Sequence, residues 1–273
     1  MSEFLFTTHD GAVIRGLDEG AGPALLCVSG LGGAASFWDP CAAELLRDWR
    51  LLRLDQRAIG ASSRGQAPCS VELLAHDCLA LLDDRGVDSC IVAGHSTGGC
   101  IAQAMALAAP QRVRAMALSG SWAKPDRYLH ELFTMRLSLL GESPRAYASS
   151  SAFLSYEPAW LDAHWDAYER LVATAPTDPA AQAVVRERMH ALLRFDQSAR
   201  LSALTCPTLV VGARDDLIVP PHLQESLAQC LPGARLVLLE RGGHFFPVTR
   251  SAEFLTVLRG WLTGVAPEAA PAS

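Results

Sequence analysis

The sequence has 273 residues, of which 50% are hydrophobic and 19% are charged, proportions typical of a globular protein and unlike those of a disordered chain. Its formal net charge of −6 argues against nucleic acid or an anionic membrane surface as the main partner. No apolar run approaches the roughly 18 residues that a membrane-spanning helix needs, so we expect no association with a membrane.

The first part of the chain alternates short apolar strands with helices. Two strands, at residues 4–8 and 12–17, are predicted first and are joined by a turn that contains Gly11. Further strands are predicted at residues 24–28, 51–54, 91–93 and 113–118. Helical patterns lie between them at residues 36–48, 70–85 and 100–108. This alternation indicates βαβ units, and therefore an α/β fold with a mostly parallel sheet and helices on both faces.

A turn made almost wholly of small residues, GHSTGG at residues 94–99, joins one of these strands to the helix that follows it. The pattern Gly94-x-Ser96-x-Gly98 is that of a nucleophile elbow, and strand–turn–helix is the context that such an elbow requires. So sharp a turn strains the backbone of its central residue, and it needs glycine where a Cβ would meet neighbouring chain. We therefore predict that the turn presents the Ser96 hydroxyl as a nucleophile beside the first amides of the next helix.

The alternation stops between residues 121 and 205, where only helices and loops are predicted and aromatic side chains are frequent. It resumes with strands at residues 207–211 and 235–239, each followed by a helix. We therefore predict one α/β core, formed by residues 1–120 and 206–263, into which a helical cap at residues 121–205 is inserted.

The last helix is predicted at residues 251–262, and residues 264–273, rich in Ala and Pro, are predicted to form a disordered tail. An insertion at the carboxyl edge of a parallel sheet lies over the ligand crevice. We therefore interpret the cap as a lid over a substrate pocket, with a purely structural appendage as the alternative. Trp122, Trp160 and Phe245 are the candidate pocket residues.

A catalytic serine needs a base to take its proton and a carboxylate to orient that base. On this architecture the expected order along the chain is serine, acid, histidine. His244 lies in a glycine-flanked loop after the last strand, where the backbone can bend the imidazole back over the sheet, so we predict it as the base. Asp215 and Asp216 follow the preceding strand; we favour Asp216 as the acid, and accepting hydrogen bonds from loop amides is the other role open to an aspartate here.

Other polar residues near these positions are interpreted as structural. His95 adjoins Ser96, but its side chain should point away from the hydroxyl, so we expect it to serve packing. Four basic residues could contact a substrate carboxylate, but we expect each of them on the solvated surface: Lys124, Arg127, Arg136 and Arg145.

The eight cysteines are scattered along the chain and include no C-x-x-C pair. Several, Cys100 among them, fall in predicted strands or helices, where a thiol behaves as a small hydrophobe. We therefore expect reduced thiols, no disulfide framework and no metal site. Since the N-terminus also lacks the pattern of a secretory signal, we expect a cytoplasmic protein.

Several segments together resemble the α/β-hydrolase fold superfamily. They are GHSTGG at residues 94–99, Asp55-Gln56-Arg57, Asp216-x-x-Val219-Pro220 and Gly242-Gly243-His244. The loop at residues 29–33 is similar to the oxyanion loop of that superfamily, whose members usually have His where this chain has Ser29. The resemblance implies that the backbone amides of Leu31 and Thr97 form an oxyanion hole.

The same resemblance implies a serine hydrolase that cleaves a small ester, lactone, amide or carbamate through an acyl-enzyme, with no metal or organic cofactor. A narrower similarity, to the RutD-like group of aminoacrylate or carbamate hydrolases, lies in residues 28–33, 37–38, 55–57 and 153–160. Carbon–carbon bond hydrolases and cofactor-free haloperoxidases share the triad, so they stay open as alternatives.

Two interpretations outside hydrolysis are also considered. Gly30-x-Gly32-x-x-Ala35 follows a strand and Asp55 ends the next one, which matches part of a dinucleotide-binding pattern and would indicate an NAD(P)-dependent oxidoreductase. The second interpretation is a catalytically silent α/β-hydrolase fold that serves as a binding module. Neither of them gives the elbow a role, so a small-molecule substrate is the expected partner. Monomer and homodimer both stay open.

Overall fold

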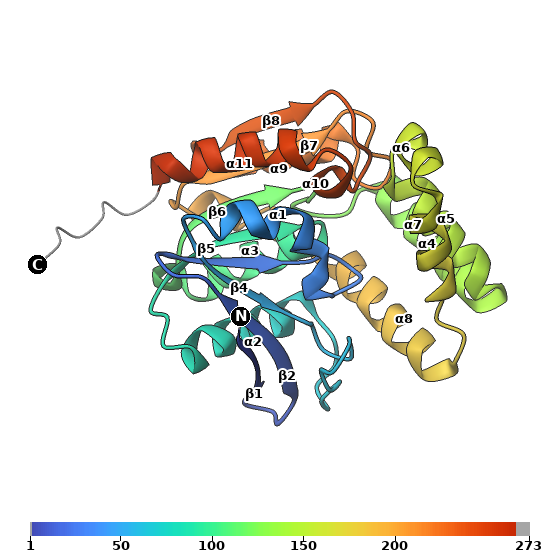
Figure 1. The fold of residues 1–273 in the computed structure, drawn as a ribbon, viewed down its shortest axis with the longest axis horizontal. Coiled ribbons are helices and arrows are strands. Elements are labelled where there is room, and N and C mark those ends of the chain that lie inside the picture. The colour runs from blue at the N-terminus through green and yellow to red at the C-terminus, as the bar shows by residue number, and fades with distance from the viewer. Residues whose placement is uncertain (1, 266–273) are drawn as a thin grey trace, which may run out of the picture.

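Figure 1 shows the computed structural model of the chain, which describes residues 2–265. Its centre is an eight-stranded sheet in the order β1-β2-β4-β3-β5-β6-β7-β8. The strands are β1 (Ser2–Thr7), β2 (Val13–Glu19), β3 (Ala24–Val28), β4 (Arg50–Leu54), β5 (Cys90–His95), β6 (Val113–Ser119), β7 (Thr208–Ala213) and β8 (Arg235–Leu239). β2 pairs antiparallel with β1 and β4, and the other pairings are parallel. The predicted fold class is confirmed.

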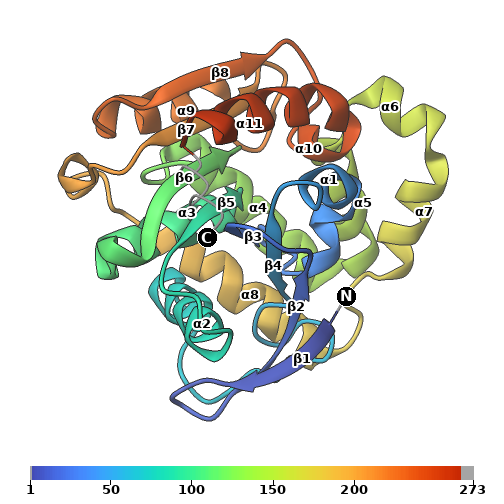
Figure 2. The ribbon, with the colours of Figure 1, turned by 60° about the vertical axis from the view of Figure 1, so that its left-hand side comes forward.

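Helices cover both faces of the sheet (Figures 1 and 2). They are α1 (Asp39–Leu45), α2 (Val71–Asp84), α3 (Thr97–Ala108), α9 (Pro221–Cys230), α10 (Phe246–Thr249) and α11 (Ser251–Val265). Successive side chains of a strand point to opposite faces. In β3, Leu26 therefore belongs to the apolar cluster that contains α2, α3 and α9, whereas Leu25 and Cys27 belong to the cluster that contains α1 and α11.

Local chemistry explains where these helices begin. The Ser70 hydroxyl accepts a hydrogen bond from the backbone N–H of Leu73, which caps the N-terminus of α2 as that residue type favours. The helix predicted at residues 36–48 is divided into a 3₁₀ turn (Ala35–Trp38) and α1. The reason is Pro40, which has no N–H and is favoured in the first turn of a new helix.

At the C-terminal end of the core, the last helix is longer than predicted. α11 continues to Val265 instead of ending at residue 262, and Val265 packs against the apolar cluster that contains α1. Residues 264 and 265, which the prediction assigns to the tail, are therefore helical. The remaining part of the predicted tail, residues 266–273, lies outside the described residues.

Five helices follow β6 and precede β7. They are α4 (Arg127–Glu142), α5 (Pro144–Ser155), α6 (Pro158–Ala163), α7 (Trp165–Ala173) and α8 (Pro179–Arg194). In Figure 1, α4–α7 stand beside the sheet and α8 leads back toward it. Phe133 of α4, Tyr147 of α5 and Leu192 of α8 belong to the same apolar cluster as α2 and α3, so these helices pack on the core.

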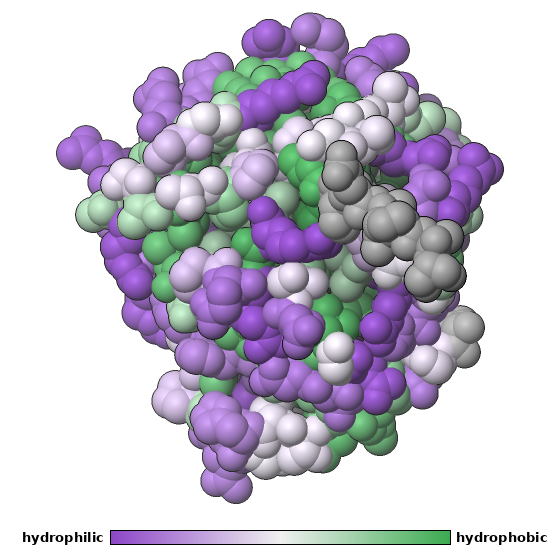
Figure 3. Space-filling view, turned by 90° about the vertical axis from the view of Figure 1, so that its left-hand side faces the viewer, coloured by the Kyte–Doolittle hydropathy of each residue, from purple (hydrophilic) through white to green (hydrophobic). Residues whose placement is uncertain are grey.

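The surface is mixed in character. On the face in Figure 3, hydrophilic side chains spread over the molecule with smaller hydrophobic groups between them, as is usual for a globular protein. No helix in the described part of the chain combines the length and the hydropathy that crossing a bilayer requires.

Candidate active site

Ser96 lies at the turn between β5 and α3 in a backbone conformation that residues with a Cβ rarely adopt. Its φ is 56° and its ψ is −124°, and Ala58 is the only other non-glycine residue with positive φ within residues 2–265. Hydrogen bonds hold the turn on both sides, from Ser96 N to Ser119 O at 2.8 Å and from Gly99 N to Ser96 O at 2.9 Å. The surrounding chain therefore imposes a strained turn, a feature that clusters at functional positions.

Three glycines allow the backbone to approach this turn closely. A Cβ at Gly94 would lie 2.3 Å from Gly98 O, and one at Gly98 would lie 2.2 Å from Val28 O. A Cβ at Gly30 would lie 2.8 Å from Ser96 Cβ and 3.3 Å from Ser96 Oγ. The start of α3 and the loop after β3 therefore meet at Ser96, and side chains at these positions would force them apart.

Asp216 and His244 form a buried pair. His244 Nδ1 lies 2.8 Å from Asp216 Oδ2, and each residue is 2% exposed. The other carboxylate oxygen, Oδ1, accepts hydrogen bonds from the backbone N–H groups of Ile218 and Val219, both at 2.8 Å. Asp216 is thereby fixed by its own turn and holds the imidazole through its second oxygen, which leaves Nε2 free to act on another group.

Asp215 contacts the same loop differently. Its two carboxylate oxygens accept hydrogen bonds from the N–H groups of Gly242 at 3.0 Å and Gly243 at 2.9 Å. Both glycines have positive φ, 143° and 66°, which only glycine adopts readily. Of the two candidate acids, Asp216 bonds the imidazole, and Asp215 bonds the backbone of the loop that carries it.

The His244 ring lies beside the end of β5. Its centroid is 4.8 Å from that of His95, the residue before Ser96. A Cβ at Gly120 would lie 3.2 Å from the Cε1 atoms of both rings. Within residues 2–265 the Ser96 hydroxyl has no hydrogen bond to the His244 ring, and such catalytic bonds are often long before a substrate binds.

His95 is fully buried and serves packing, as expected. One of the groups that it packs against is the His244 ring. Its ring stacks on Phe37 at 4.6 Å, and its Nδ1 lies 3.0 Å from the Ser119 hydroxyl. Burial holds the pKa of His95 well below its usual range, with a smaller contribution from His244. The His95 ring therefore stays neutral and packs against the His244 imidazole.

The two predicted oxyanion donors belong to the two segments that flank Ser96, the start of α3 and the loop after β3. Thr97 is the first residue of α3, where backbone N–H groups have no partner inside the helix. Leu31 follows Gly30, the glycine that packs against the Ser96 side chain. Both amides thus belong to segments that meet at the strained turn.

Arg188, from α8, reaches the Leu31 loop, a role that is not among the predictions from the sequence. It is 4% exposed, and its Nε donates a hydrogen bond to Leu31 O at 2.8 Å. A signal exists in the sequence, because Arg188 lies one turn from Val184 and one turn from Leu192, on the apolar side of the helix.

Of the four basic residues that we expect on the solvated surface, one is buried. Arg136 is 4% exposed rather than solvated. Its guanidinium lies 5.1 Å from the ring centroids of both Phe133 and Tyr147 and donates to the Ser151 hydroxyl at 2.6 Å. Aromatic faces and a hydroxyl thus replace water around the cation. The other three residues are exposed as expected: Lys124, Arg127 and Arg145.

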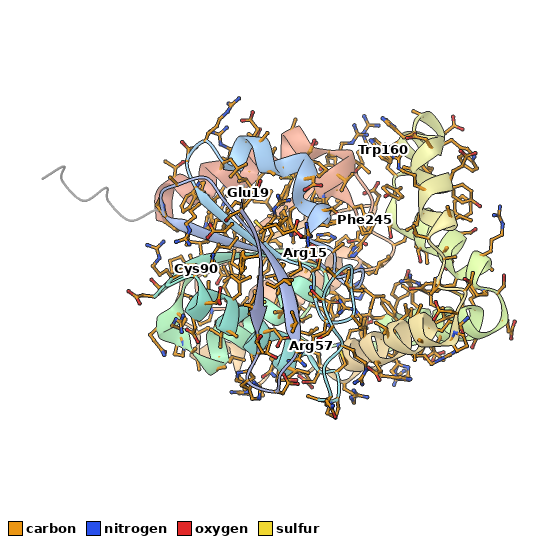
Figure 4. The ribbon with its side chains drawn as sticks, turned by 60° about the horizontal axis from the view of Figure 1, so that its bottom comes forward. Arg15, Glu19, Arg57, Cys90, Trp160 and Phe245 are labelled. Atoms are coloured by element: carbon orange, nitrogen blue, oxygen red, sulfur yellow. The ribbon has the colours of Figure 1, made fainter. Side chains whose placement is uncertain are left out.

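Two of the three candidate pocket aromatics lie where the helices between β6 and β7 meet the core, as the labels in Figure 4 show. Phe245 contacts Tyr156 edge-on at 5.2 Å, and Tyr156 stacks on Trp160 at 5.0 Å. Phe245 and Trp160 are both half-buried. Trp122 differs, because it is 0% exposed and belongs to the apolar core.

The carboxylate that suggested a dinucleotide site already has protein partners. Asp55 Oδ1 accepts a hydrogen bond from the backbone N–H of Ala35 at 2.8 Å, and Oδ2 pairs with Arg15 at 2.8 Å. Both oxygens therefore stabilise the loop after β3 and the edge of the sheet. This arrangement does not favour recognition of a ribose.

The structure also shows the state of the cysteine thiols and the arrangement of potential metal ligands. All eight cysteines are free, and burial raises the pKa of Cys100 to about 12, so this thiol near Ser96 stays protonated. Among residues 2–265, no group of three or more His, Cys, Asp or Glu side chains is arranged to hold a metal ion.

Known proteins with similar sequences and structures share this architecture. A family model described as alpha/beta hydrolase fold matches residues 23–251. A protein from Variovorax paradoxus named "Putative carbamate hydrolase RutD" is 36% identical over 254 residues, which cover 92% of this chain and 96% of that protein. One of the same name from Azorhizobium caulinodans is 33% identical over 243 residues, which cover 89% and 92% respectively.

One solved structure is similar to this chain over nearly the whole length of both. The crystal structure of a hydrolase from Pseudomonas aeruginosa PA01 matches with a TM-score of 0.86 and 27% identity, over 96% of this chain and 98% of that one. The predicted resemblance is thereby confirmed. This chain is a hydrolase that belongs to the α/β-hydrolase fold family, within which it is RutD-like.

Proposed function

We propose that this enzyme is a serine hydrolase in which Ser96 is the nucleophile, His244 is the general base and Asp216 orients His244. The observation that carries the proposal is the buried Asp216–His244 hydrogen bond of 2.8 Å beside a serine with strained φ and ψ. A serine, a base and an orienting carboxylate are the three groups that acyl transfer needs.

In this reaction His244 takes the proton of the Ser96 hydroxyl while Oγ attacks the carbonyl carbon of the substrate. The oxyanion that forms accepts hydrogen bonds from the amides of Leu31 and Thr97, and one such donor typically contributes about 3–4 kcal/mol to transition-state stabilisation. His244 then protonates the leaving group, and a water molecule that it activates releases the acyl group from Ser96. Residues of the chain supply each step, so the reaction requires no metal or organic cofactor.

The substrate is a small molecule with an ester, lactone, amide or carbamate group. The names of the two relatives make carbamates the first class to test. Residues 121–205 act as the cap over this substrate, with Phe245, Tyr156 and Trp160 at the junction as apolar contacts. Eight free thiols are consistent with a cytoplasmic enzyme.

The test is a screen of p-nitrophenyl esters, lactones and small carbamates with the parent enzyme and Ser96→Ala. We expect the substitution to lower kcat by at least about 10³-fold on every substrate that the parent cleaves, with an unchanged circular dichroism spectrum. A fluorophosphonate should label the parent enzyme at Ser96 and leave the variant unlabelled. Equal turnover by the two proteins would overturn the proposal.

A further inference from the structure

The cap helix α8 contributes a buried guanidinium to the loop that follows β3. Arg188 Nε donates to Leu31 O at 2.8 Å, and Nη2 donates to Gly30 O at 3.2 Å and to Gln56 Oε1 at 2.5 Å. Two donors on one edge of the guanidinium therefore bind two successive carbonyl groups. Only a rigid, planar fork such as the arginine side chain makes this contact.

In the described part of the chain, the buried Arg188 guanidinium has no counter-ion. Within residues 2–265, Arg188 has no ion pair, while its neighbour Glu187 pairs with Arg64 at 2.7 Å on the surface. Nη1 is buried and has no hydrogen-bond partner in that part of the chain. Burial lowers the pKa of Arg188 accordingly. An uncompensated buried charge is costly, and the three hydrogen bonds that the guanidinium donates offset part of this cost.

The backbone carbonyl that Nη2 binds, that of Gly30, belongs to the same peptide group as one of the proposed oxyanion donors. Gly30 C=O and Leu31 N–H belong to one planar peptide group and point in opposite directions. A hydrogen bond from a cation to this oxygen fixes the plane and polarises the N–H at its other side, which strengthens the N–H as a donor. The same peptide lies against Ser96, since a Cβ at Gly30 would be 2.8 Å from Ser96 Cβ.

The rest of the loop is held by the core. Gln56 Nε2 donates to Ser29 O at 2.7 Å, and Gln56 N donates to Gly33 O at 2.8 Å. Gln56 is 2% exposed, and its side-chain oxygen is the third acceptor of Arg188. The cap and the core therefore hold the loop together, with Gln56 on one side and Arg188 on the other.

We propose that Arg188 is a positioning residue through which the cap orients and polarises the Leu31 amide of the oxyanion hole. The inference rests on the proposed function and goes beyond it, because it makes the rate of acyl transfer depend on the placement of a cap helix. Arg188 touches none of the reacting atoms. Its effect belongs to the transition state, in which the oxyanion develops, and leaves ground-state binding of a neutral substrate unchanged.

The test compares Arg188→Lys and Arg188→Met with the parent enzyme on p-nitrophenyl acetate, a neutral substrate. We expect kcat to fall about 10–100-fold in both variants with KM changed less than about twofold, since lysine keeps the charge but loses the fork. A trifluoromethyl ketone, whose adduct with Ser96 carries the oxyanion, should bind more weakly by the same factor by which kcat/KM falls. A role in folding alone would not produce this correlation.

Arg186→Met is the matched control, because Arg186 lies on the same helix and is half-buried, and within residues 2–265 its side chain bonds only Gln182, at 3.4 Å. We expect it to leave kcat and KM unchanged. Melting temperatures identify the folded variants. If Arg188→Met does not fold, the kinetics of Arg188→Lys, which keeps most of the packing, test the proposal.

Three results separate the possible failures. An unchanged kcat in a folded Arg188 variant overturns the inference while Ser96→Ala still abolishes activity. A higher KM limited to substrates that carry a carboxylate also overturns it, because Arg188 would then bind the substrate. Activity that survives Ser96→Ala instead removes the proposed function.

Discussion

At the scale of single residues, two neighbouring aspartates have different tasks in one loop. Asp216 bonds the His244 imidazole, whereas Asp215 bonds the Gly242 and Gly243 amides that carry it. Sequence spacing favours Asp216 but leaves both open, because adjacent residues of a turn can exchange these tasks with a small change of backbone angle. The directions of the side chains decide between them.

Asp216→Asn is expected to reduce kcat by about 10³–10⁴-fold, because an amide in place of the carboxylate favours the wrong tautomer of His244. Asp215→Asn is the matched control, and we expect it to lower the melting temperature with a much smaller loss of kcat. Steady-state kinetics and thermal unfolding of the two variants make the comparison. A larger loss of kcat in Asp215→Asn would assign the acid to Asp215.

His95 makes the stability of the fold depend on pH. Burial holds its pKa well below the usual range, so the folded protein keeps the ring neutral, whereas the unfolded chain protonates it below about pH 6.5. The unfolded state then binds more protons, so this group lowers the unfolding free energy by ~1.4 kcal/mol for each pH unit below that value, until the folded pKa is reached.

Urea unfolding at pH 7, 6 and 5 measures this effect. His95→Gln should show a shallower decrease in unfolding free energy than the parent, and His190→Gln, at an exposed position, should follow the parent. Parallel pH dependences in the parent and His95→Gln would contradict the assignment.

At the scale of elements, the sequence predicts the strands and the longer helices of the core to within a few residues. The strands predicted at residues 24–28 and 235–239 have the observed bounds, because turns and glycines delimit short apolar runs. The four-residue helix α10 could not be predicted, since its buried residues depend on contacts with distant parts of the chain. Arg188 was missed for the same reason, because its partners are more than 130 positions away.

Gly98→Ala is expected to reduce both stability and activity. Its Cβ would lie 2.2 Å from Val28 O and 2.8 Å from Ser29 O, and these backbone atoms cannot move without shifting β3 against α3. We expect a loss of about 1–3 kcal/mol in unfolding free energy, as in other overpacked sites, together with a lower kcat.

Gly260→Ala is the opposite case and serves as the control. Gly260 lies in α11, is exposed and has no atom within 4 Å of the added Cβ. Alanine should raise the unfolding free energy by about 0.5–1 kcal/mol, because it reduces the conformational freedom of the unfolded chain. Thermal denaturation distinguishes the two variants, and a stabilised Gly98→Ala would show that the close contact is not maintained.

At the scale of the whole molecule, the proposed cap contacts the loop that carries His244. Phe245 N donates to Ser155 O at 2.8 Å, and a Cβ at Gly243 would lie 2.8 Å from the same oxygen. Glu157 is 6% exposed and forms ion pairs with Arg250 and, at 3.7 Å, with Arg241. The end of α5 is thereby fixed to the segment that positions the imidazole.

Glu157→Gln should lower the unfolding free energy by roughly 1–3 kcal/mol, because it leaves the partly buried Arg250 without its counter-charge. It should also lower kcat, since the His244 loop loses a support. Glu187→Gln removes a different ion pair between cap and core, the exposed one to Arg64, and should cost less than about 1 kcal/mol. Urea titrations give the two free energies, and equal losses would show that burial of Glu157 is unimportant.

The contact between Ser155 and Phe245 has a consequence for protein engineering. Exchange of residues 121–205 between homologues, as a route to a new specificity, would assume that the core accepts any inserted segment. In this enzyme a transplanted segment would also have to supply a backbone carbonyl that accepts the hydrogen bond from Phe245 N, next to His244. Chimeras that keep residues 155–157 with the recipient core should therefore outperform those that replace the whole insertion.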